Sequence, residues 1–197
     1  RELLSMPQLH LNTGLNALIN VGQINFFSFL TLFLREVVVV SQPIAGLAMG
    51  LAQTASAVGR IFWGIACDKW FLGNRRVLMA FLCGAASILL ASLALVQPGW
   101  GLWLGLILTT FLGLTIASYA PIAQAITVEM VSPHLSGSAL GYNLLGVFIG
   151  GMLGPPIFGA ILDQSDSFAL GWLVTAVITA FGTFMLVKWF KEGGSAN

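Results

Sequence analysis

The sequence predicts an all-α transmembrane protein, a six-helix bundle of two inverted three-helix repeats. Its composition, the spacing of its charges and an internal repeat support this prediction. Of the 197 residues, 57% are hydrophobic and only 8% are charged, and the mean hydropathy is +0.93. Soluble domains carry about 25% charged residues. The composition therefore excludes a soluble enzyme, a disordered chain and a nucleic-acid-binding protein.

The charge-free runs mark the membrane spans, because a spanning helix needs about 20 apolar residues. The run 77–128 is too long for one span, and QPGW at 97–100 divides it. We therefore expect six helices, at about 11–34, 44–66, 77–96, 101–127, 137–162 and 168–187.

The basic residues predict the orientation. Six spans place both termini on one side, together with six of the eight Lys and Arg residues: Arg1, Lys69, Arg75, Arg76, Lys188 and Lys191. The opposite side has only Arg35. Cytoplasmic loops carry an excess of Lys and Arg. We therefore expect a multi-pass protein of the cell (inner) membrane with both termini cytoplasmic.

The second and fifth predicted helices are similar at an offset of 95 residues. Their matching positions are Gly46 with Gly141, Gly59 with Gly154, Gly64 with Gly159 and Asp68 with Asp163. The topology places the two aspartates on opposite sides of the membrane. This arrangement is the one that two inverted repeats of three helices produce.

The most distinctive segment is GRIFWGIACDK at 59–69, followed by GNRR at 73–76. A second segment contains SGSALG at 136–141 and GGMLGPP at 150–156. They resemble the signature loop and the eleventh helix of the major facilitator superfamily, and the resemblance extends from about Leu9 to Lys188. In this chain the next glycine, Gly73, stands five positions after Asp68, whereas three positions are commoner.

The resemblance implies that residues 1–192 are the C-terminal six-helix half of a secondary transporter, a symporter or antiporter. Residues 193–197 are expected to be a flexible tail or an engineering scar. The partners of this C-terminal half would be the lipid bilayer, the N-terminal six-helix half and a small-molecule solute. The alternative is a complete six-span protein that acts as a homodimeric transporter or channel.

Six charged residues are candidates for a conformational gate: Arg60, Asp68, Lys69, Arg75, Arg76 and Glu129. A carboxylate such as Asp68 can accept hydrogen bonds from a neighbouring helix N-terminus, and the resemblance implies that this latch joins the two halves. Arg60 lies inside a helix end, where a charge needs a partner. Glu129 is its expected partner, and Arg75 and Arg76 could join them. The alternative for Lys69, Arg75 and Arg76 is that they only set the topology.

Polar residues of the first helix share one face, and the resemblance implies that the first and fourth helices line the solute pathway. The alternative is hydrogen bonding between helices. The candidate pathway residues are Asn16, Asn20, Gln23, Phe27, Gln53, Tyr119 and Asn143. No Asp or Glu lies in mid-span, so any coupling carboxylate must come from the other half. Because no cation lies in mid-span either, we expect a neutral or zwitterionic solute, or an anion whose charge the other half meets.

Gly146, Gly150 and Gly154 are spaced four residues apart, which allows close packing of two helices. The chain offers no plausible nucleophile–base pair, no metal-ligand cluster and no disulfide framework. We therefore expect neither an enzyme, nor a metal, nor a cofactor.

Overall fold

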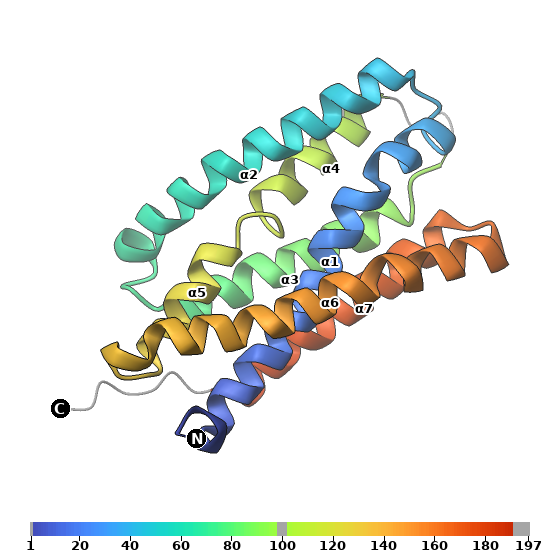
Figure 1. Ribbon diagram of the computed structural model, residues 1–197. Helices are drawn as coiled ribbons and strands as arrows, with labels where there is room; N and C mark the ends of the chain where they lie inside the picture. Colours follow the sequence, from blue (N-terminus) through green and yellow to red (C-terminus); the bar gives the residue numbers. More distant parts are fainter. Residues whose placement is uncertain (1, 98–101, 191–197) are drawn as a thin grey trace.

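The computed structural model describes residues 2–97 and 102–190, which form α-helices and short 3-10 helices (Figure 1). The α-helices are α1 (Pro7–Glu36), α2 (Gln42–Trp70), α3 (Arg75–Leu93), α4 (Leu102–Leu114), α5 (Ala120–Glu129), α6 (Ser136–Ser165) and α7 (Phe168–Lys188). The 3-10 helices are η1 (Leu3–Ser5) and η2 (Pro133–Leu135). The expected tail at 193–197 lies outside the described residues.

The fourth predicted helix, 101–127, is not continuous, because it breaks between α4 and α5. Two hydroxyls near the break bind backbone carbonyls: Thr115 donates to Phe111 O (2.8 Å) and Ser118 donates to Gly113 O (2.9 Å). Such bonds compete with regular helix geometry. Pro121, which has no N–H to donate, lies in the first turn of α5. Local sequence therefore favours the interruption.

Four helical segments among the described residues are long and apolar enough to cross a membrane: Pro7–Glu36, Arg75–Leu93, Pro133–Ser165 and Phe168–Lys188. The helix α2 has 29 residues but carries Arg60, Asp68 and Lys69. The helix α4 is apolar but has only 13 residues.

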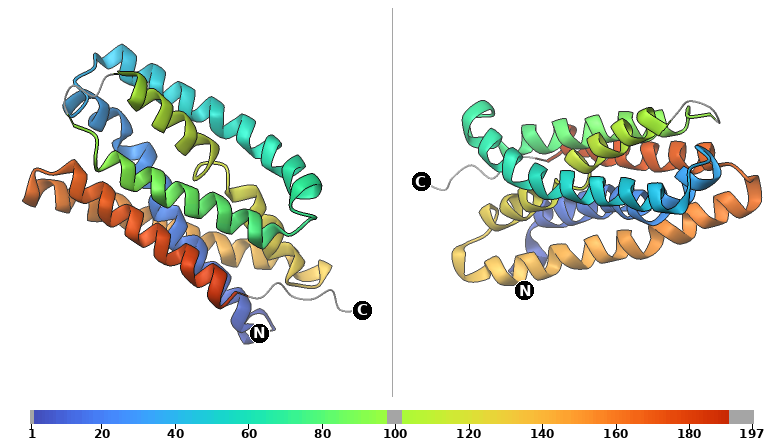
Figure 2. Two further views of the ribbon diagram at one scale, coloured as in Figure 1. Left: turned by 180° about the vertical axis from the view of Figure 1, so that it is seen from behind. Right: turned by 90° about the horizontal axis from the view of Figure 1, so that it is seen from above.

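The helices form an elongated bundle in which α1 contacts most of the others (Figures 1 and 2). Its most extensive contact is with α6, and it also packs on α7 and α2. The helix α2 packs on α4, and α3 packs on α7. The chain enters α1 and leaves α7 at the same end of the bundle (Figure 1).

Glycines bring α6 very close to α1. A Cβ atom at Gly150 would lie 2.1 Å from the carbonyl oxygen of Ala17, and one at Gly146 would lie 2.6 Å from that of Thr13. A Cβ at Gly154 would lie 2.9 Å from Oδ1 of Asn25. Any side chain at these positions would force the helices apart, so close backbone contact between α1 and α6 depends on glycine.

Large apolar side chains fill the bundle around this contact. At one end Trp172 packs edge-on against Phe33 and Phe158, with ring centroids 5.6 and 4.9 Å away. At the end where the chain enters and leaves, Phe190 and Leu186 are buried with residues of α1, α3 and α5. The interior is thus densely packed at both ends.

Candidate functional site

The asparagines near the start of α1 form a directed chain of hydrogen bonds. Thr127 donates its hydroxyl to Ala123 O (2.8 Å) and accepts from Nδ2 of Asn12 (2.9 Å). Nδ2 of Asn16 donates to Oδ1 of Asn143 on α6 (2.9 Å) and, more weakly, to Oδ1 of Asn12 (3.4 Å). Asn12, Asn16 and Asn143 are all buried. These bonds tie α1 to α5 and α6.

Two further α1 asparagines bind neighbouring helices. Nδ2 of Asn20 donates to the backbone carbonyl of Val147 (2.7 Å), and Nδ2 of Asn25 donates to the Thr175 hydroxyl (3.0 Å). A polar side chain surrounded by hydrocarbon needs such a partner. The polar face of α1 therefore forms interhelical bonds along much of its length.

A small pocket lies where α1, α5 and α6 meet. It encloses about 50 Å³, and its polar lining comes from Asn16, Gln23, Tyr119, Gln124 and Asn143. The structure thus brings together four of the seven predicted pathway residues: Asn16, Gln23, Tyr119 and Asn143. The apolar remainder of the lining comes from Ala120, Ala123, Leu144 and Val147.

The other three predicted pathway residues lie elsewhere. Asn20 is held against the α6 backbone. Gln53 is exposed on α2. Phe27 is half-buried beside Phe26, with ring centroids 5.1 Å apart. Helical spacing alone does not separate these positions from the pocket-lining ones.

The break between α4 and α5 exposes backbone carbonyls that side chains of α1 and α2 bind. The carbonyl oxygen of Ala117 accepts from the Ser56 hydroxyl (2.8 Å), Nε2 of Gln23 (3.4 Å) and Nη2 of Arg60 (3.4 Å). The indole N–H of Trp63 donates to Leu114 O (2.6 Å). The break is therefore held by specific donors and connects the pocket residue Gln23 with Arg60.

Sequence reasoning missed Ser56 and Trp63 as donors to the break. Their only sequence signal is their place on the same face of the second predicted helix as Gly59. That signal has no meaning until the fourth helix is known to be broken. His10, which the sequence suggests is an ordinary interface residue, binds the Tyr142 hydroxyl through Nδ1 (2.7 Å) and joins α1 to α6.

The predicted partner of Arg60 is wrong. In the described part of the chain Glu129 forms its ion pair with Arg75, at the start of α3. The Arg60 guanidinium instead reaches the freed carbonyl of Ala117. The reason is the broken helix, which places an unpaired acceptor nearer to Arg60 than the carboxylate at the far end of α5.

Arg76 anchors the end of α7. Its guanidinium donates to the backbone carbonyls of Leu186 (3.3 Å) and Val187 (2.5 Å). These carbonyls belong to the last turn of the helix, which has no N–H partners of its own. A cation at a helix C-terminus is also favoured by the helix dipole.

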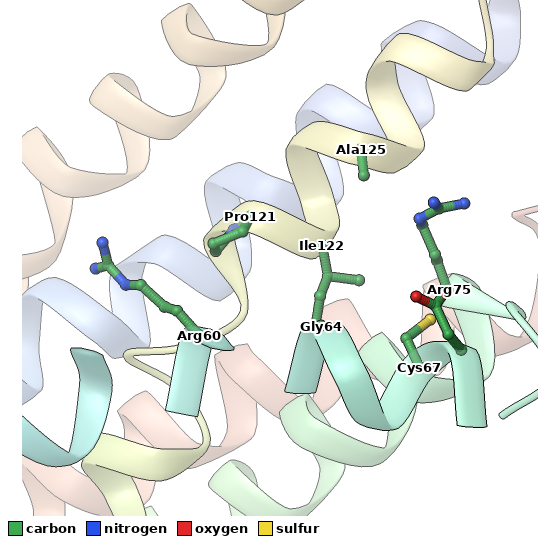
Figure 3. Close-up of a pocket in the computed structure, with 8 residues that line it drawn as sticks. Arg60, Gly64, Cys67, Arg75, Pro121, Ile122 and Ala125 are labelled. Atoms are coloured by element: carbon green, nitrogen blue, oxygen red, sulfur yellow. The ribbon is translucent and has the colours of Figure 1, made fainter. Parts of the chain in front are cut away.

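Arg60, Asp68 and Arg75 line a groove of about 290 Å³ between α2 and α5 (Figure 3). Arg60 extends past Pro121, while Arg75 stands at the opposite end of the groove (Figure 3). Asp68 and Lys69 are both exposed, and Lys69 lies outside the groove. Of the six predicted gate residues, three thus share one groove and a fourth, Glu129, joins it through Arg75.

The tight turn after α2 brings this charged segment back to α3. Gly73 has φ of +75°, which favours glycine, and its N–H donates to Cys67 O (2.9 Å). The side chain of Asn74 then caps α3 by accepting from the N–H of Val77 (3.0 Å). These contacts place Asp68 and Arg75 at the same groove.

A family model described as the Major Facilitator Superfamily matches residues 13–196. The chain belongs to this superfamily. It is therefore an integral, multi-pass membrane protein of a membrane transport family. Within the residues that the structure describes, no group of three His, Cys, Asp or Glu side chains could hold a metal ion.

Curated relatives support the same assignment. The multi-drug resistance efflux pump PmrA of Streptococcus pneumoniae is 33% identical over 68% of this chain and 33% of its own length. Monocarboxylate transporter 11 of Mus musculus is 28% identical over 72% of this chain and 32% of its own. The uncharacterized MFS-type transporter YuxJ of Bacillus subtilis is 27% identical over 91% of this chain and 45% of its own. The chain spans about a third to just under half the length of these relatives.

Solved transporters share the fold. The fucose:proton symporter FucP of Escherichia coli superposes with a TM-score of 0.78 at 15% identity, over 94% of this chain and 43% of that one. The inward-open xylose transporter XylE of E. coli gives 0.69 at 15% identity, over 90% and 46%.

Proposed function

We propose that this chain is the C-terminal half of a secondary active transporter that carries a small solute by alternating access. The observation that carries the proposal is the polar pocket beside the break between α4 and α5. In many secondary transporters the solute site lies at the interface of structural repeats, where helices are discontinuous. Asn16, Gln23, Tyr119 and Asn143 would contact the solute.

Six membrane crossings are compatible with the fold. The helices α4 and α5 follow each other along one direction and together form the fourth crossing (Figure 1). The helix α2 forms the second, with its polar residues turned partly toward the break. An even number of crossings agrees with α1 beginning and α7 ending at the same end of the bundle. The excess of Lys and Arg favours the cytoplasm for that end.

Contacts between the crossings support an inverted repeat. Gly59 of α2 lies against Leu114 O and the Ser118 side chain of the fourth crossing. Its counterpart Gly154 of α6 lies against Val21 O and the Asn25 side chain of the first crossing. The contact between the first and fifth crossings thus resembles the contact between the fourth and second crossings.

The rest of the transporter would supply a second six-helix half. The relatives are two to three times as long as the region they share with this chain. That half would face the groove at Asp68, and it would supply the ion-coupling carboxylates that the spans of this chain lack. The relatives are named for drugs, for monocarboxylates and for fucose, so their names do not select a solute.

Counterflow in proteoliposomes tests the proposal. Vesicles containing the full-length gene product are loaded with a candidate solute, and uptake of the same labelled solute is followed. A transporter accelerates this exchange without any ion gradient. If no solute from a broad set of sugars, amines, carboxylates and drugs exchanges above protein-free vesicles, secondary transport is refuted.

The alternative is a six-span protein that functions as a homodimer. The intact mass of the native gene product separates the two. A mass about twice the 20.9 kDa of this chain supports the two-half transporter. A mass near 20.9 kDa supports the homodimer, in which the groove at Asp68 would face its own copy.

A further inference from the structure

The orientation of the Asn16 amide is determined by the groups around it. The Thr127 hydroxyl uses its proton on Ala123 O, so it accepts from Asn12 and leaves Oδ1 of Asn12 facing Asn16. Asn16 turns its Nδ2 toward Asn12 and Asn143, which both present Oδ1. If the Asn16 amide were reversed, its Oδ1 would face the Oδ1 atoms of Asn12 and Asn143 as they are placed here.

This orientation leaves Oδ1 of Asn16 unsatisfied. Asn16 is fully buried, and none of the described residues donates a hydrogen bond to this oxygen. A buried carbonyl without a donor is costly, and native proteins rarely keep one without a reason. Because Asn16 lines the small pocket, the missing donor can come from what enters it.

The pocket accepts a small group without formal negative charge. Its volume of about 50 Å³ compares with about 30 Å³ for one water in the liquid. None of the described residues that line it is charged. A carboxylate would place an acceptor against Oδ1 of Asn16 with no cation beside it, whereas a hydroxyl or an ammonium N–H would satisfy the oxygen.

We propose that this pocket binds a hydrogen-bond donor of the transported solute, a hydroxyl or a protonated amine, and that Asn16 is the acceptor that selects it. This inference rests on the proposed function and names the chemical class recognised by the same site. A group that displaces a bound water keeps affinity only if it reproduces the water's hydrogen bonds, and only a donor group can do so at Oδ1 of Asn16.

Matched probes separate the effect of a hydrogen-bond donor from the effect of charge. The full-length protein, purified in detergent, is titrated with benzylammonium and benzyltrimethylammonium, which share a charge but differ in N–H donors. Xylitol and its permethyl ether make the same comparison for hydroxyls, and benzoate and pyruvate represent carboxylates. The readout is Kd from ligand-induced thermal stabilisation, with no need for any variant.

We expect the donor member of at least one pair to bind about tenfold more tightly than its methylated analogue. An amine preference alone identifies a cationic solute, and a xylitol preference alone identifies a polyol. Equal binding within both pairs, or stabilisation by the carboxylates alone, overturns the proposal. If the carboxylates also exchange in counterflow, the proposed transport function holds even though the donor preference is overturned.

The variant Asn16→Leu tests the residue, with Asn25→Leu as its control. Both asparagines lie on α1, both are buried and both have an unsatisfied Oδ1, but only Asn16 lines this pocket. Asn16→Leu should abolish the tenfold preference, and Asn25→Leu should retain it. A preference that survives in Asn16→Leu, or disappears equally in both, assigns recognition to other residues.

Discussion

At the scale of single residues, the contact between α1 and α6 depends on the absence of a side chain. A methyl group at Gly150 would lie 2.1 Å from the carbonyl oxygen of Ala17, and both backbones are held by neighbouring glycine contacts. Forcing extra atoms into a close-packed interior costs about 1–3 kcal/mol. Gly150→Ala should therefore lower the melting temperature of the purified protein.

Gly141→Ala on the same helix is the matched control, because a Cβ there would meet nothing within 4 Å. Alanine is also a better helix former than glycine by about 1 kcal/mol. We expect Gly141→Ala to keep or raise the melting temperature. Equal melting temperatures for the two variants would contradict the close approach of α1 and α6.

Asn20 and Asn16 should behave differently although they are one helical turn apart. Nδ2 of Asn20 donates to the backbone carbonyl of Val147, and Asn20 itself does not line the pocket. Asn20→Ala should therefore cost about 1 kcal/mol of stability and leave the Kd for the transported solute unchanged. Asn16→Ala should weaken solute binding. Thermal unfolding and binding isotherms of both variants test this, and a raised Kd in Asn20→Ala would return that residue to the solute pathway.

At the scale of the helices, most bounds could be predicted because charges and breakers mark where apolar runs end. The break at 115–119 could not, since 101–127 has no charged residue to mark an end and its Thr, Ser and Pro are also common in membrane helices. Its stability comes from Ser56, Trp63 and Arg60 on another helix. For the same reason the pairing of Arg60 was not accessible from the sequence.

Of the candidate site, only the face of α1 that carries its polar residues was predictable. Periodicity identifies the polar side of α1, but that side is wide enough to touch α5, α6 and α7 at once. Whether an amide that bonds to a neighbouring helix also lines the pocket depends on how the helices pack around it. Asn16 and Asn20 differ in this way, and no sequence pattern encodes the difference.

The break between α4 and α5 should loosen when the shortest hydrogen bond to Ala117 O is removed. The Ser56 hydroxyl makes the shortest of the three bonds to Ala117 O. Ser56→Ala should speed hydrogen–deuterium exchange of the peptide that contains residues 114–120, because local opening becomes easier. Thr54→Ala is the control, since that exposed hydroxyl binds only Gly50 O within its own helix. Identical exchange in both variants would show that the break is held by other contacts.

At the scale of the whole molecule, the proposed repeat assigns different roles to two similar aspartates. Asp68 lines the groove at the end of α2 together with Arg60 and Arg75, whereas its counterpart Asp163 lies near the end of α6. The proposed topology places these ends on opposite sides of the membrane. If Asp68 latches one end of the transporter, its charge biases the conformational equilibrium without touching the solute.

Asp68→Asn should therefore slow counterflow about tenfold, because about 1.4 kcal/mol on a rate-limiting conformational step is tenfold in rate. The Kd for solute should change less than twofold, because Asp68 does not line the pocket. Removal of one charge leaves the side-chain volume unchanged, so a general loss of packing is avoided. Asp163→Asn, the same substitution at the repeat-related position, should leave the rate closer to that of the wild type, because Asp163 does not line the groove. Counterflow rates and binding isotherms of both variants decide the matter: equal slowing would assign both ends to the gate, and a wild-type rate in Asp68→Asn would exclude the latch.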